Sequence, residues 1–536
     1  MAKNIQAPSS DMEDLSRSNE APCHSILIAC RGELSVIENR IATIHQEITE
    51  TDSKSALALR KEESTLKVYA ETYRRILHPI RNFPVDVLRE IFSACIRITH
   101  PDFMSSDFNY VFQDSLDTTQ PPWSLGQVCH RWRQIVLDTP SFWTSLRVQL
   151  PQCEAVPQEK RYIARQLDMF LYRSRDLPLT VELKSKHSIT PDDLIPFAFC
   201  SYSHRWERLR LTFPDTPYLH ESLRNISFLI RLELPILHTL CLDLDVYSSE
   251  TDAFEYAPNL RHLTIYGCSP DLHATLQIPW GQITHFHRLQ RTTGYTRPST
   301  SIEHLIQMPN IVEYIDMQFF CPPGPDVHLP HLESLALAFS DNLESDIALD
   351  RLRIGAKFTR FVASTSNCRD NCRDNEGLGE RDKQALLSFI RRWSDNLRSL
   401  SLRSALLTNP ECAEMLGYLD GLRSLSLYTN MSLSLYLCIM TAKPGGALED
   451  ELAQTSFLPQ LRHLFFFGHS RLGESELVRS LEARLKGDTP LQTIGLPERL
   501  SAGSSKRLNA KGLAIRLTTR EQWMAESYGN KCDIHM

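Results

Sequence analysis

Apolar residues follow two different periods along this chain of 536 residues, and the change comes near residue 144. Before it, apolar side chains recur every three or four residues, which is the period of an amphipathic α-helix. After it, a pattern of apolar-x-x-apolar-x-apolar recurs, which is typical of short strands that begin after a turn. The pattern therefore predicts a helical N-terminal part followed by a repetitive part with strands.

Residues 25–79 are a predicted helical arm with two heptad seams, each with apolar residues on one face. The seams consist of Leu34, Ile37, Ile41, Ile44 and Ile48, and of Leu66, Tyr69, Tyr73, Ile76 and Ile80. The polar stretch between them predicts either one long helix with a slip or a helical hairpin that turns near Asp52. We favour packing within the chain; the alternative is a dimerising coiled coil, through which the N-terminal helix self-associates. Residues 1–24 are polar and aperiodic, so we expect them to be disordered.

Three short helical patterns follow the arm. Pro84 fits the first turn of a helix, because its missing N–H would have no partner there. Ser124 and Gln127 have the spacing of a capping box at the start of the second helix, and Thr139 with Pro140 indicates the start of a third. The apolar faces consist of Leu88, Ile91, Phe92 and Cys95 in the first helix, and of Leu125, Val128, Cys129, Trp132, Ile135 and Val136 in the second. A segment this small cannot bury both faces alone, so part of this surface is expected to meet a partner.

These residues together resemble an F-box. The match comprises F-P-x-x-V-L-x-x-I-F from Phe83 to Phe92, V-C-H-x-W-x-x-I from Val128 to Ile135, and the closing F-W at Trp143. The sequence departs from the family pattern twice. Asp86 replaces the usual glutamate, and the polar and aromatic insertion His100–Pro122 separates the first two helices. The insertion is long enough to fold onto the motif or to shield it.

The resemblance implies a Skp-type adaptor as partner and, through it, a cullin-based ubiquitin ligase. The residues carried over as adaptor-facing or motif-core residues are Pro84, Leu88, Ile91, Phe92, Val128, Cys129, Trp132 and Trp143. We expect Trp132 to be the core anchor, because truncating a buried aromatic side chain costs about 3–5 kcal/mol. An ordinary helical hairpin packed on the next domain is the alternative interpretation.

The six-residue pattern recurs throughout the second part of the chain, with anchors 20 to 39 residues apart. The anchors are Trp206, Leu237, Leu260, Val312, Leu332, Phe358, Leu397, Leu422, Leu461 and Leu491, with a weaker copy at Ile283. The pattern is that of the leucine-rich repeat, whose core is L-x-x-L-x-L. This region resembles the irregular leucine-rich repeats of fungal F-box proteins. A non-repetitive α/β domain with similar strands is the alternative.

The predicted fold is therefore α/β, with an N-terminal helical arm and a three-helix F-box before an irregular leucine-rich-repeat solenoid with a curved parallel sheet. Strands at 145–148 and 179–183 are expected to begin the array. The expected boundaries are 1–24 disordered, 25–79 arm, 80–143 F-box, 144–500 solenoid and 501–536 a partly disordered tail.

Composition narrows the range of functions. The 58 basic and 65 acidic residues give a net charge of −7, which argues against a dedicated nucleic-acid binder. No apolar run approaches the length of a membrane span and the N-terminus has no secretory pattern, so we expect an intracellular protein of the cytoplasm or nucleus. The 14 cysteines are scattered, as expected for free thiols.

No phosphate-binding loop, dinucleotide fingerprint or nucleophile elbow is present, so we expect no catalytic residues and no cofactor. Cys368 and Cys372 would supply half a metal site, but no second pair stands nearby, so we expect no metal. Several histidines lie at or beside the predicted strands without an acid and a nucleophile aligned to them.

We therefore expect a non-catalytic substrate receptor of a ubiquitin ligase, whose repeats bind an unknown target protein. An interaction scaffold uncoupled from the ligase is the alternative, and an enzyme of unrecognised type is disfavoured. Residues between the leucines should face outward, which in the C-terminal repeats exposes Arg398, Ser399, Ser401, Arg423, Ser424, Ser426, Arg462, His463 and Phe465. Arg398, Arg423, Arg462 and His463 would then suit an acidic or phosphorylated target.

Overall fold

We describe the protein from a computed structural model. The structure describes residues 7–18, 20–50, 53–99, 112–150, 157–185, 194–212, 219–230, 234–243, 251–266, 276–289, 301–319, 321, 323–339, 348–365, 380–403, 406–428, 458–467, 473–485, 490–496 and 499–518. The chain divides into two compact units. The first consists of Met1–Asp102, Gln113–Arg147 and Arg165–Leu177, and the second of Phe103–Phe112, Val148–Ala164 and Pro178–Met536.

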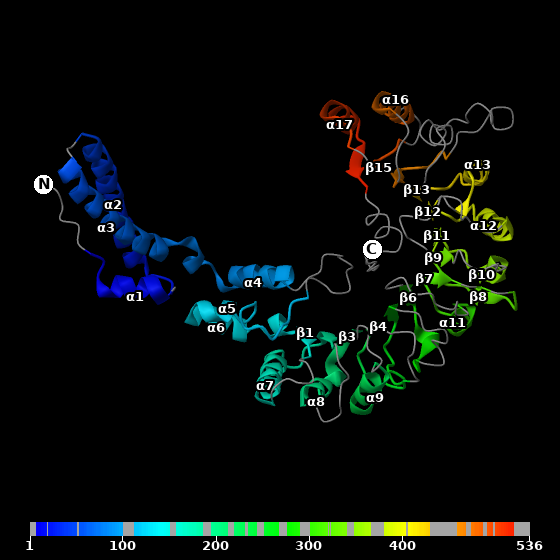
Figure 1. The fold of residues 1–536 in the computed structure, drawn as a ribbon, viewed down its shortest axis with the longest axis horizontal. Helices are drawn as coiled ribbons and strands as arrows, with labels where there is room; N and C mark the ends of the chain where they lie inside the picture. The colour runs from blue at the N-terminus through cyan, green and yellow to red at the C-terminus, as the bar shows by residue number, and fades with distance from the viewer. Residues whose placement is uncertain are drawn as a thin grey trace. The chain divides into compact units, whose positions relative to one another are not determined.

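The first unit begins with a helical hairpin of α2 (His24–Glu50) and α3 (Ser53–Leu77), drawn side by side in Figure 1. The two heptad seams meet in one apolar cluster, in which Ile37, Ile44 and Leu66 are buried. The hairpin is thus the correct one of the two sequence-based alternatives. Because the seams are buried against each other, a dimer that used them would have to open the hairpin.

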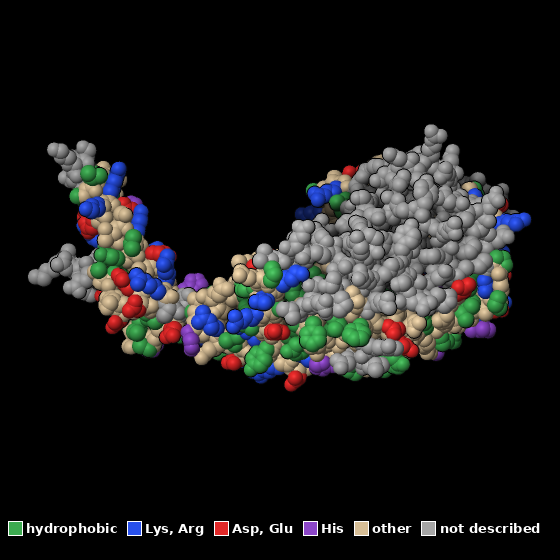
Figure 2. Space-filling view, turned by 60° about the horizontal axis from the view of Figure 1, so that its bottom comes forward, with side chains coloured by type: hydrophobic (Ala, Val, Ile, Leu, Met, Phe, Trp, Pro, Cys, Tyr) green, Lys and Arg blue, Asp and Glu red, His purple; other side chains and the backbone are tan. Residues whose placement is uncertain are grey.

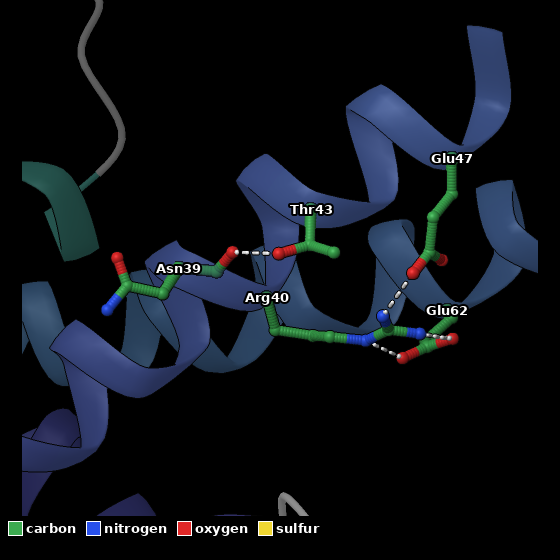
Figure 3. Close-up of polar contacts among 5 residues, drawn as sticks. All are labelled: Asn39, Arg40, Thr43, Glu47 and Glu62. Carbon is green, nitrogen blue, oxygen red and sulfur yellow. Dashed lines mark hydrogen bonds and ion pairs between the residues drawn. The ribbon is translucent and has the colours of Figure 1, made fainter. Parts of the chain in front are cut away.

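Arg40 ties the two helices of the hairpin together at their surface (Figure 3). Its Nε and Nη2 donate to the two carboxylate oxygens of Glu62 on α3, at 2.9 and 3.1 Å. Its Nη1 donates to Glu47 on α2 at 3.0 Å. The hydrogen bonds to Glu62 are the largest cause of the raised pKa of Arg40.

Helix α1 (Ser10–Ser18) lies within the segment that the sequence predicted to be disordered. Met12 and Leu15 pack against the apolar cluster of the hairpin. The prediction of disorder is therefore wrong for these residues, because two apolar side chains in a polar segment suffice when a partner surface is present.

The rest of the first unit is a small helical block. It contains the 3-10 helices η1 (Pro79–Asn82) and η2 (Pro140–Trp143) and the α-helices α4 (Val85–Thr99), α5 (Leu125–Val128) and α6 (His130–Leu137). The first two strong helical patterns of the sequence fall on α4 and on α5 with α6. The third falls on η2, which is a single tight turn. Most of the insertion His100–Pro122 lies outside the described residues.

In the described part of the chain, a curved parallel sheet of 14 strands forms the frame of the second unit, and the boundary between the units falls within its first strand. The strand order follows the chain from β1 to β16, except that β8 and β10 form a separate parallel pair. The strands are β1 (Ser145–Gln149), β2 (Leu179–Lys184), β3 (Trp206–Thr212), β4 (Thr239–Asp243), β5 (His262–Tyr266), β6 (His285–Leu289), β7 (Glu313–Phe319), β8 (Val327–Leu329), β9 (Ser334–Phe339), β10 (Leu352–Ile354), β11 (Arg360–Thr365), β12 (Ser399–Arg403), β13 (Ser424–Tyr428), β14 (His463–Phe466), β15 (Thr493–Leu496) and β16 (Ala514–Leu517). The predicted parallel-sheet solenoid is confirmed.

The strand register places the second apolar residue of each repeat in one continuous row. Leu240 pairs with Leu263, and Leu400 with Leu425, which in turn pairs with Leu464. All of these side chains are buried. Before each strand of this sheet from β4 to β14, one carbonyl accepts two backbone N–H groups of the next repeat, as Arg398 does from Arg423 and Ser424 at 2.9 Å each. This repeated backbone pairing stacks the units in register.

The repeat at β7 is shifted by one residue from the predicted frame. Tyr314, and not Ile315, pairs with Leu335, so the row continues through Tyr314 and Asp316. The frame anchored at Val312 is therefore wrong. Apolar residues occupy both faces of β7, and the acidic residue on the core face concealed the true alternation. The copy of the pattern at Ile283 is weak for the same reason, because Arg288 on β6 holds its last core position. Arg288 donates two hydrogen bonds of 2.8 Å to Asp316 on the neighbouring strand.

In the second unit the helices lie on the outer side of the arc that the chain forms, and the strands of the sheet lie on its inner side (Figure 1). The outer helices of this unit are α8 (Leu194–Cys200), α9 (Leu219–Ile230), α11 (Ser301–Gln307), α12 (Glu380–Arg392), α13 (Asn409–Gly417), α16 (Glu474–Arg484) and α17 (Ala502–Asn509), with α7 (Pro157–Arg173) divided between the units. The short 3-10 helices are η3 (Ser203–Arg205), η4 (Trp280–Gln282) and η5 (Leu349–Arg351). Helices α12 and α16 each bury a leucine against the sheet side of the array, Leu386 and Leu481.

The sheet extends beyond residue 500, where the sequence predicted its end. Strand β16 pairs in parallel with β15, and Ile494 lies opposite Ile515. The sequence of β16 lacks the full six-residue pattern, so only its pairing with β15 identifies it as a further strand.

Candidate protein-binding surfaces

Helix α4 packs one apolar face into the helical block. Leu88 and Phe92 are fully buried, and the Phe92 ring lies 4.6 Å from the ring of Trp132. Pro84 stands just before the helix, where its lack of an N–H group costs nothing, and it is exposed. Ile91 is half-buried at the edge of the same face. The helix therefore has an inner face that holds the block together and an outer edge that remains accessible.

The second helical pattern is broken at Cys129, whose backbone is extended. Its Sγ accepts a hydrogen bond from the Trp132 N–H at 3.5 Å and caps α6. Ser124, by contrast, has helical backbone angles and makes no side-chain capping bond, so the predicted capping box with Gln127 is wrong. The residue that does cap a helix is Cys129, five residues after Ser124, directly before α6 begins at His130.

Trp143 is the aromatic centre of the block. It is fully buried, and its Nε1 donates to the Val136 carbonyl at 3.0 Å. The Trp123 ring meets it edge-on at 4.9 Å, and the Arg173 guanidinium lies 4.7 Å from Trp123 and 4.5 Å from Trp143. Burial lowers the pKa of Arg173. Trp132, the anchor expected from the sequence, is only half-buried.

Two arginines connect the block to the rest of the first unit, and no sequence pattern pointed to their role. Arg131 on α6 donates to the carbonyls of Arg81 and Phe83 at 2.6 Å each. Arg81 is itself buried and donates to the carbonyls of Leu15, Ser16 and Glu20, at 2.8, 3.0 and 3.2 Å. Burial lowers its pKa. These contacts tie the segment at the end of α1 to the start of the block, over more than 60 residues of sequence.

Aliphatic side chains remain exposed on the helical block, and we call them the block surface. They are Val85 at 39%, Val87 at 42%, Ile98 at 80%, Val128 at 43% and Leu137 at 39% exposure. Val87, Ile91 and Ile98 follow one another along α4 at helical spacing, next to the buried Leu88 and Phe92. Exposed aliphatic side chains in a row of this kind indicate a surface that meets a partner.

In the solenoid, Arg398, Arg423 and Arg462 occupy the same position before three consecutive strands of the sheet. Arg423 and Arg462 are exposed. Arg398 is half-buried, and its Nη1 donates to the carbonyls of Asp395, Leu397 and Gly421, at 2.8, 3.1 and 3.4 Å. The three arginines are therefore brought together, but Arg398 has a structural task at the turn.

His463 follows this row on β14, half-buried. Burial is the largest cause of its lowered pKa, and the charges of Arg462 and Arg516 lower it further. An imidazole beside two arginines is held in its neutral form near pH 7. It can donate or accept a hydrogen bond at this place, but it adds no positive charge.

Three residues expected to face outward are buried. Ser401, Ser426 and Phe465 alternate with the leucines and lie on the inner face of the sheet, but their exposure is only 5%, 8% and 8%. The prediction of their direction holds, and that of their exposure is wrong. Strands about 4.8 Å apart crowd small side chains on the inside of a curved sheet.

A row of histidines lies in the N-terminal half of the solenoid. The rings of His238, His262 and His285 follow one another at 4.6 and 4.2 Å, and His287 contacts Glu313 at 2.6 Å. Stacked rings do not turn their nitrogens toward one point. Within the described residues no group of three or more His, Cys, Asp or Glu side chains is placed to hold a metal ion, and Cys368 and Cys372 lie outside those residues.

Hydrophobic side chains also gather on the outer face that carries α8 and α9 (Figure 2). There Phe197 and Phe228 are 59% and 82% exposed. No sequence pattern singled them out, because the period alone does not distinguish an apolar residue on the outer side of a helix from a core residue.

Comparisons with known proteins leave the family open. A scan against models of protein families found no match, and a search of curated proteins found no similar sequence. Among solved structures, the chain is similar to an internalin from Listeria monocytogenes, with a TM-score of 0.30 and 12% identity over 73% of this chain and 98% of that chain. A TM-score this low does not establish a shared fold or function.

The class of the protein follows from its own geometry. It is a mixed α/β protein with a leucine-rich-repeat-like solenoid, and such arrays offer extended surfaces to protein partners. Within the described part of the chain, no helix is long and apolar enough to cross a membrane.

Proposed function

We propose that the chain is a non-catalytic substrate-recognition subunit of an SCF-type cullin ubiquitin ligase. In this proposal the helical block acts as an F-box and binds a Skp-type adaptor, while the solenoid binds the target protein. The observation that carries the proposal is the block surface, whose exposed aliphatic residues belong to the same helices as the F-box-like motifs.

The residues of the F-box-like motif divide into a buried set and an accessible set. Leu88, Phe92, Cys129 and Trp143 are buried, so they act as the core of the block. Pro84, Ile91, Val128 and Trp132 are at least partly accessible and are the motif residues that would contact an adaptor. Val87 and Ile98 extend this contact along α4.

An interaction scaffold without ligase coupling is the second candidate. Asp86 favours it, since this departure from the F-box pattern stands in the first turn of α4, where an adaptor would lie. Its carboxylate is 90% exposed and pairs with Arg89 at 2.9 Å, so it presents a charge beside the aliphatic row.

A pull-down with a purified Skp-type adaptor tests the proposal. Val87→Glu with Ile98→Glu places charges on the block surface without touching the buried core, and we expect capture to fall at least tenfold. Val68→Glu on α3, at a site 63% exposed, is the matched control and should leave capture unchanged. Leu88→Ala is unsuitable, because it would test folding. Absence of capture by the wild-type chain would favour the scaffold.

The target site is tested separately. Arg423→Glu with Arg462→Glu reverses two exposed charges on neighbouring repeats and spares Arg398, which serves the turn. We expect the double variant to lose interactors in proximity labelling while it still captures the adaptor. Arg479→Glu on the outer helix α16 is the control. The same interactors for the double variant and the wild type would place the target site elsewhere.

A further inference from the structure

The first and last strands of the sheet differ at their outer edges. The outer edge of β1 is occupied by Ser115, whose N–H donates to the Arg147 carbonyl at 2.8 Å and whose Oγ accepts from the Arg147 N–H at 2.9 Å. Strand β16, the red arrow beside α17 in Figure 1, has a paired neighbour on one side only among the described strands. We call its other side the open edge.

The backbone of β16 directs the polar groups of two residues toward the open edge. The N–H groups of Ala514 and Thr518 donate to carbonyls at the two ends of β15, at 2.9 and 2.8 Å, so these residues face β15. Successive residues of a strand direct their backbone groups to opposite sides, so Ile515 and Leu517 direct theirs away from β15. Within the described residues these N–H and C=O groups meet no partner. A row of such groups is a template for one further strand.

The side chains at the open edge extend the core of the solenoid but are incompletely covered. Ile515 and Leu517 lie opposite Ile494 and Leu496 of β15 and continue the two rows of core residues. Ile494 and Leu496 are 0% and 2% exposed, whereas Leu517 is 41% exposed. Inside the array each strand is covered by a neighbour on both sides, and in the described part β16 has only one. A segment with apolar residues at two alternate positions would complete both rows.

The last repeat is fixed in place on both faces of the sheet. Thr518, directly after β16, donates through its Oγ1 to a carbonyl of β14 at 2.5 Å, and Gly495 of β15 makes this contact feasible, because a Cβ there would overlap with Thr518. On the outer side, Glu482 of α16 pairs with Arg507 and Lys511 of the last repeat, at 3.0 and 2.9 Å. An edge held in this way loses little freedom when a segment is added to it.

The last repeat is basic, although the chain as a whole is acidic. The net charge of the chain is −7, but residues 499–518 contain no Asp or Glu. Their basic residues are Arg499, Lys506, Arg507, Lys511 and Arg516. Arg516 is exposed and stands between Ile515 and Leu517, so it belongs to the inner face of the strand, beside the open edge. A partner segment with a negative charge at this place complements it.

We propose that the open edge of β16 binds an extended segment of a partner protein as a further strand of the sheet. Two apolar residues of this segment, separated by one residue, cover Ile515 and Leu517. The residue between them is acidic and faces Arg516, because residues opposite each other in neighbouring strands share a face of the sheet. Backbone pairing gives such a complex its affinity, and the alternate side chains give it specificity. The proposal does not depend on adaptor binding by the helical block.

Two synthetic peptides test the proposal on the full chain. One probe is fluorescein-labelled Ser-Thr-Val-Glu-Val-Thr-Ser, and the other has Lys in place of Glu. Fluorescence anisotropy should show that the Glu peptide binds and that the Lys peptide binds about tenfold more weakly. Arg516→Glu should reverse this order, whereas Lys506→Glu, the same change of charge on the outer helix α17, should keep it. An unreversed order in Arg516→Glu would overturn the proposal, as would a wild-type chain that binds neither peptide.

A second pair of variants tests the backbone of the open edge. Leu517→Pro removes an N–H that points away from β15, and edge strands tolerate proline where the N–H faces outward. It should abolish binding of the Glu peptide, whereas Leu517→Val keeps the N–H and should retain binding. Circular dichroism checks that both variants fold, and if Leu517→Pro does not, the reversal by Arg516→Glu decides.

Two results of these variants would count against the proposal. Equal peptide binding by Leu517→Pro and Leu517→Val would overturn it, because the peptide would then not pair with the backbone of β16. A wild-type dimer in analytical ultracentrifugation that Leu517→Pro converts to a monomer would overturn it as well, since the open edge would then bind a second copy of this chain.

Discussion

The helical block and the solenoid bury their apolar residues in different ways. The block is a small set of short helices around Trp143, and it leaves aliphatic side chains such as Val87 and Ile98 exposed. The solenoid stacks each strand on the next, so that residues such as Leu240 and Leu400 are buried by their equivalents in neighbouring repeats. A stacked array can extend its core with every unit, whereas a small block runs out of interior.

The difference extends to charged groups. In the block, the buried Arg81 and the half-buried Arg131 donate hydrogen bonds to backbone carbonyls. In the solenoid, Arg288 and Asp316 occupy two neighbouring places in the row of leucines, with side-chain exposures of 2% and 0%. The Tyr314 hydroxyl donates to the same carboxylate at 3.0 Å. Most strands of the array have an apolar residue at this position of the row and could pair with one another. The ion pair of Arg288 and Asp316 favours the pairing of β6 with β7 over the alternatives.

The largest expected effect comes from breaking that pair. Asp316→Leu removes the carboxylate that accepts two hydrogen bonds from the buried Arg288 charge, which should lower the free energy of unfolding by about 3–5 kcal/mol. Arg288→Leu combined with Asp316→Leu should recover the loss, since two leucines would continue the row. Urea unfolding of the three variants followed by circular dichroism measures both effects. A double variant as unstable as the single one would show that the pair does more than fill its place.

Trp143→Ala should have an effect of similar size in the block, about 3–5 kcal/mol, because it removes a fully buried ring. Trp132→Ala should cost less, about 2 kcal/mol, since this ring is only half-buried. Unfolding followed by tryptophan fluorescence ranks the two variants. The reverse order would restore Trp132 as the anchor of the block and would mean that the cluster of Trp123, Trp143 and Arg173 is dispensable.

A smaller effect is expected in the hairpin. Arg40→Ala removes the hydrogen bonds to Glu62 and Glu47, but the arginine side chain is 31% exposed and both carboxylates are more exposed still. Ion pairs in such positions contribute about 0.5–1 kcal/mol. Thermal unfolding at low and high salt should show a small loss that salt diminishes. Arg74→Ala, which removes the more exposed pair with Glu38, should cost less again.

The smallest effect concerns pH in the solenoid. Burial and the two neighbouring arginines lower the pKa of His463 below its usual 6.5, so the folded state binds this proton less readily than the unfolded state. The contribution of His463 to stability is therefore fully present above the unfolded pKa and falls as the pH drops from there toward the folded pKa. NMR titration of the ring measures the shift. Arg462→Ala should raise the pKa toward 6.5, and no change would mean that burial alone is responsible.

Much of the architecture could be predicted from the sequence because its cause is local. The spacing of Leu397, Leu400 and Leu402 places two side chains on one face of a short strand, and any such strand must find a neighbour to cover that face. The heptads around Ile37 and Tyr73 required a partner seam, and each finds it in the other helix of the hairpin. The expected exposure of Ser401 and Phe465 was wrong, because neighbouring strands about 4.8 Å apart crowd the side chains on the inner face of a curved sheet.

The sequence by itself determined where the chain is helical, where it repeats and which leucines form the core, because periodicity reports how each segment meets its nearest neighbours. Only the tertiary structure decided the frame at Tyr314, where Asp316 is acceptable in a core position solely because Arg288 lies on the adjacent strand. It likewise decided that Cys129 caps a helix and that Arg173 lies against two tryptophans, 30 and 50 residues before it. Contacts of this kind join residues that no local period relates, so they become visible only once the chain is folded.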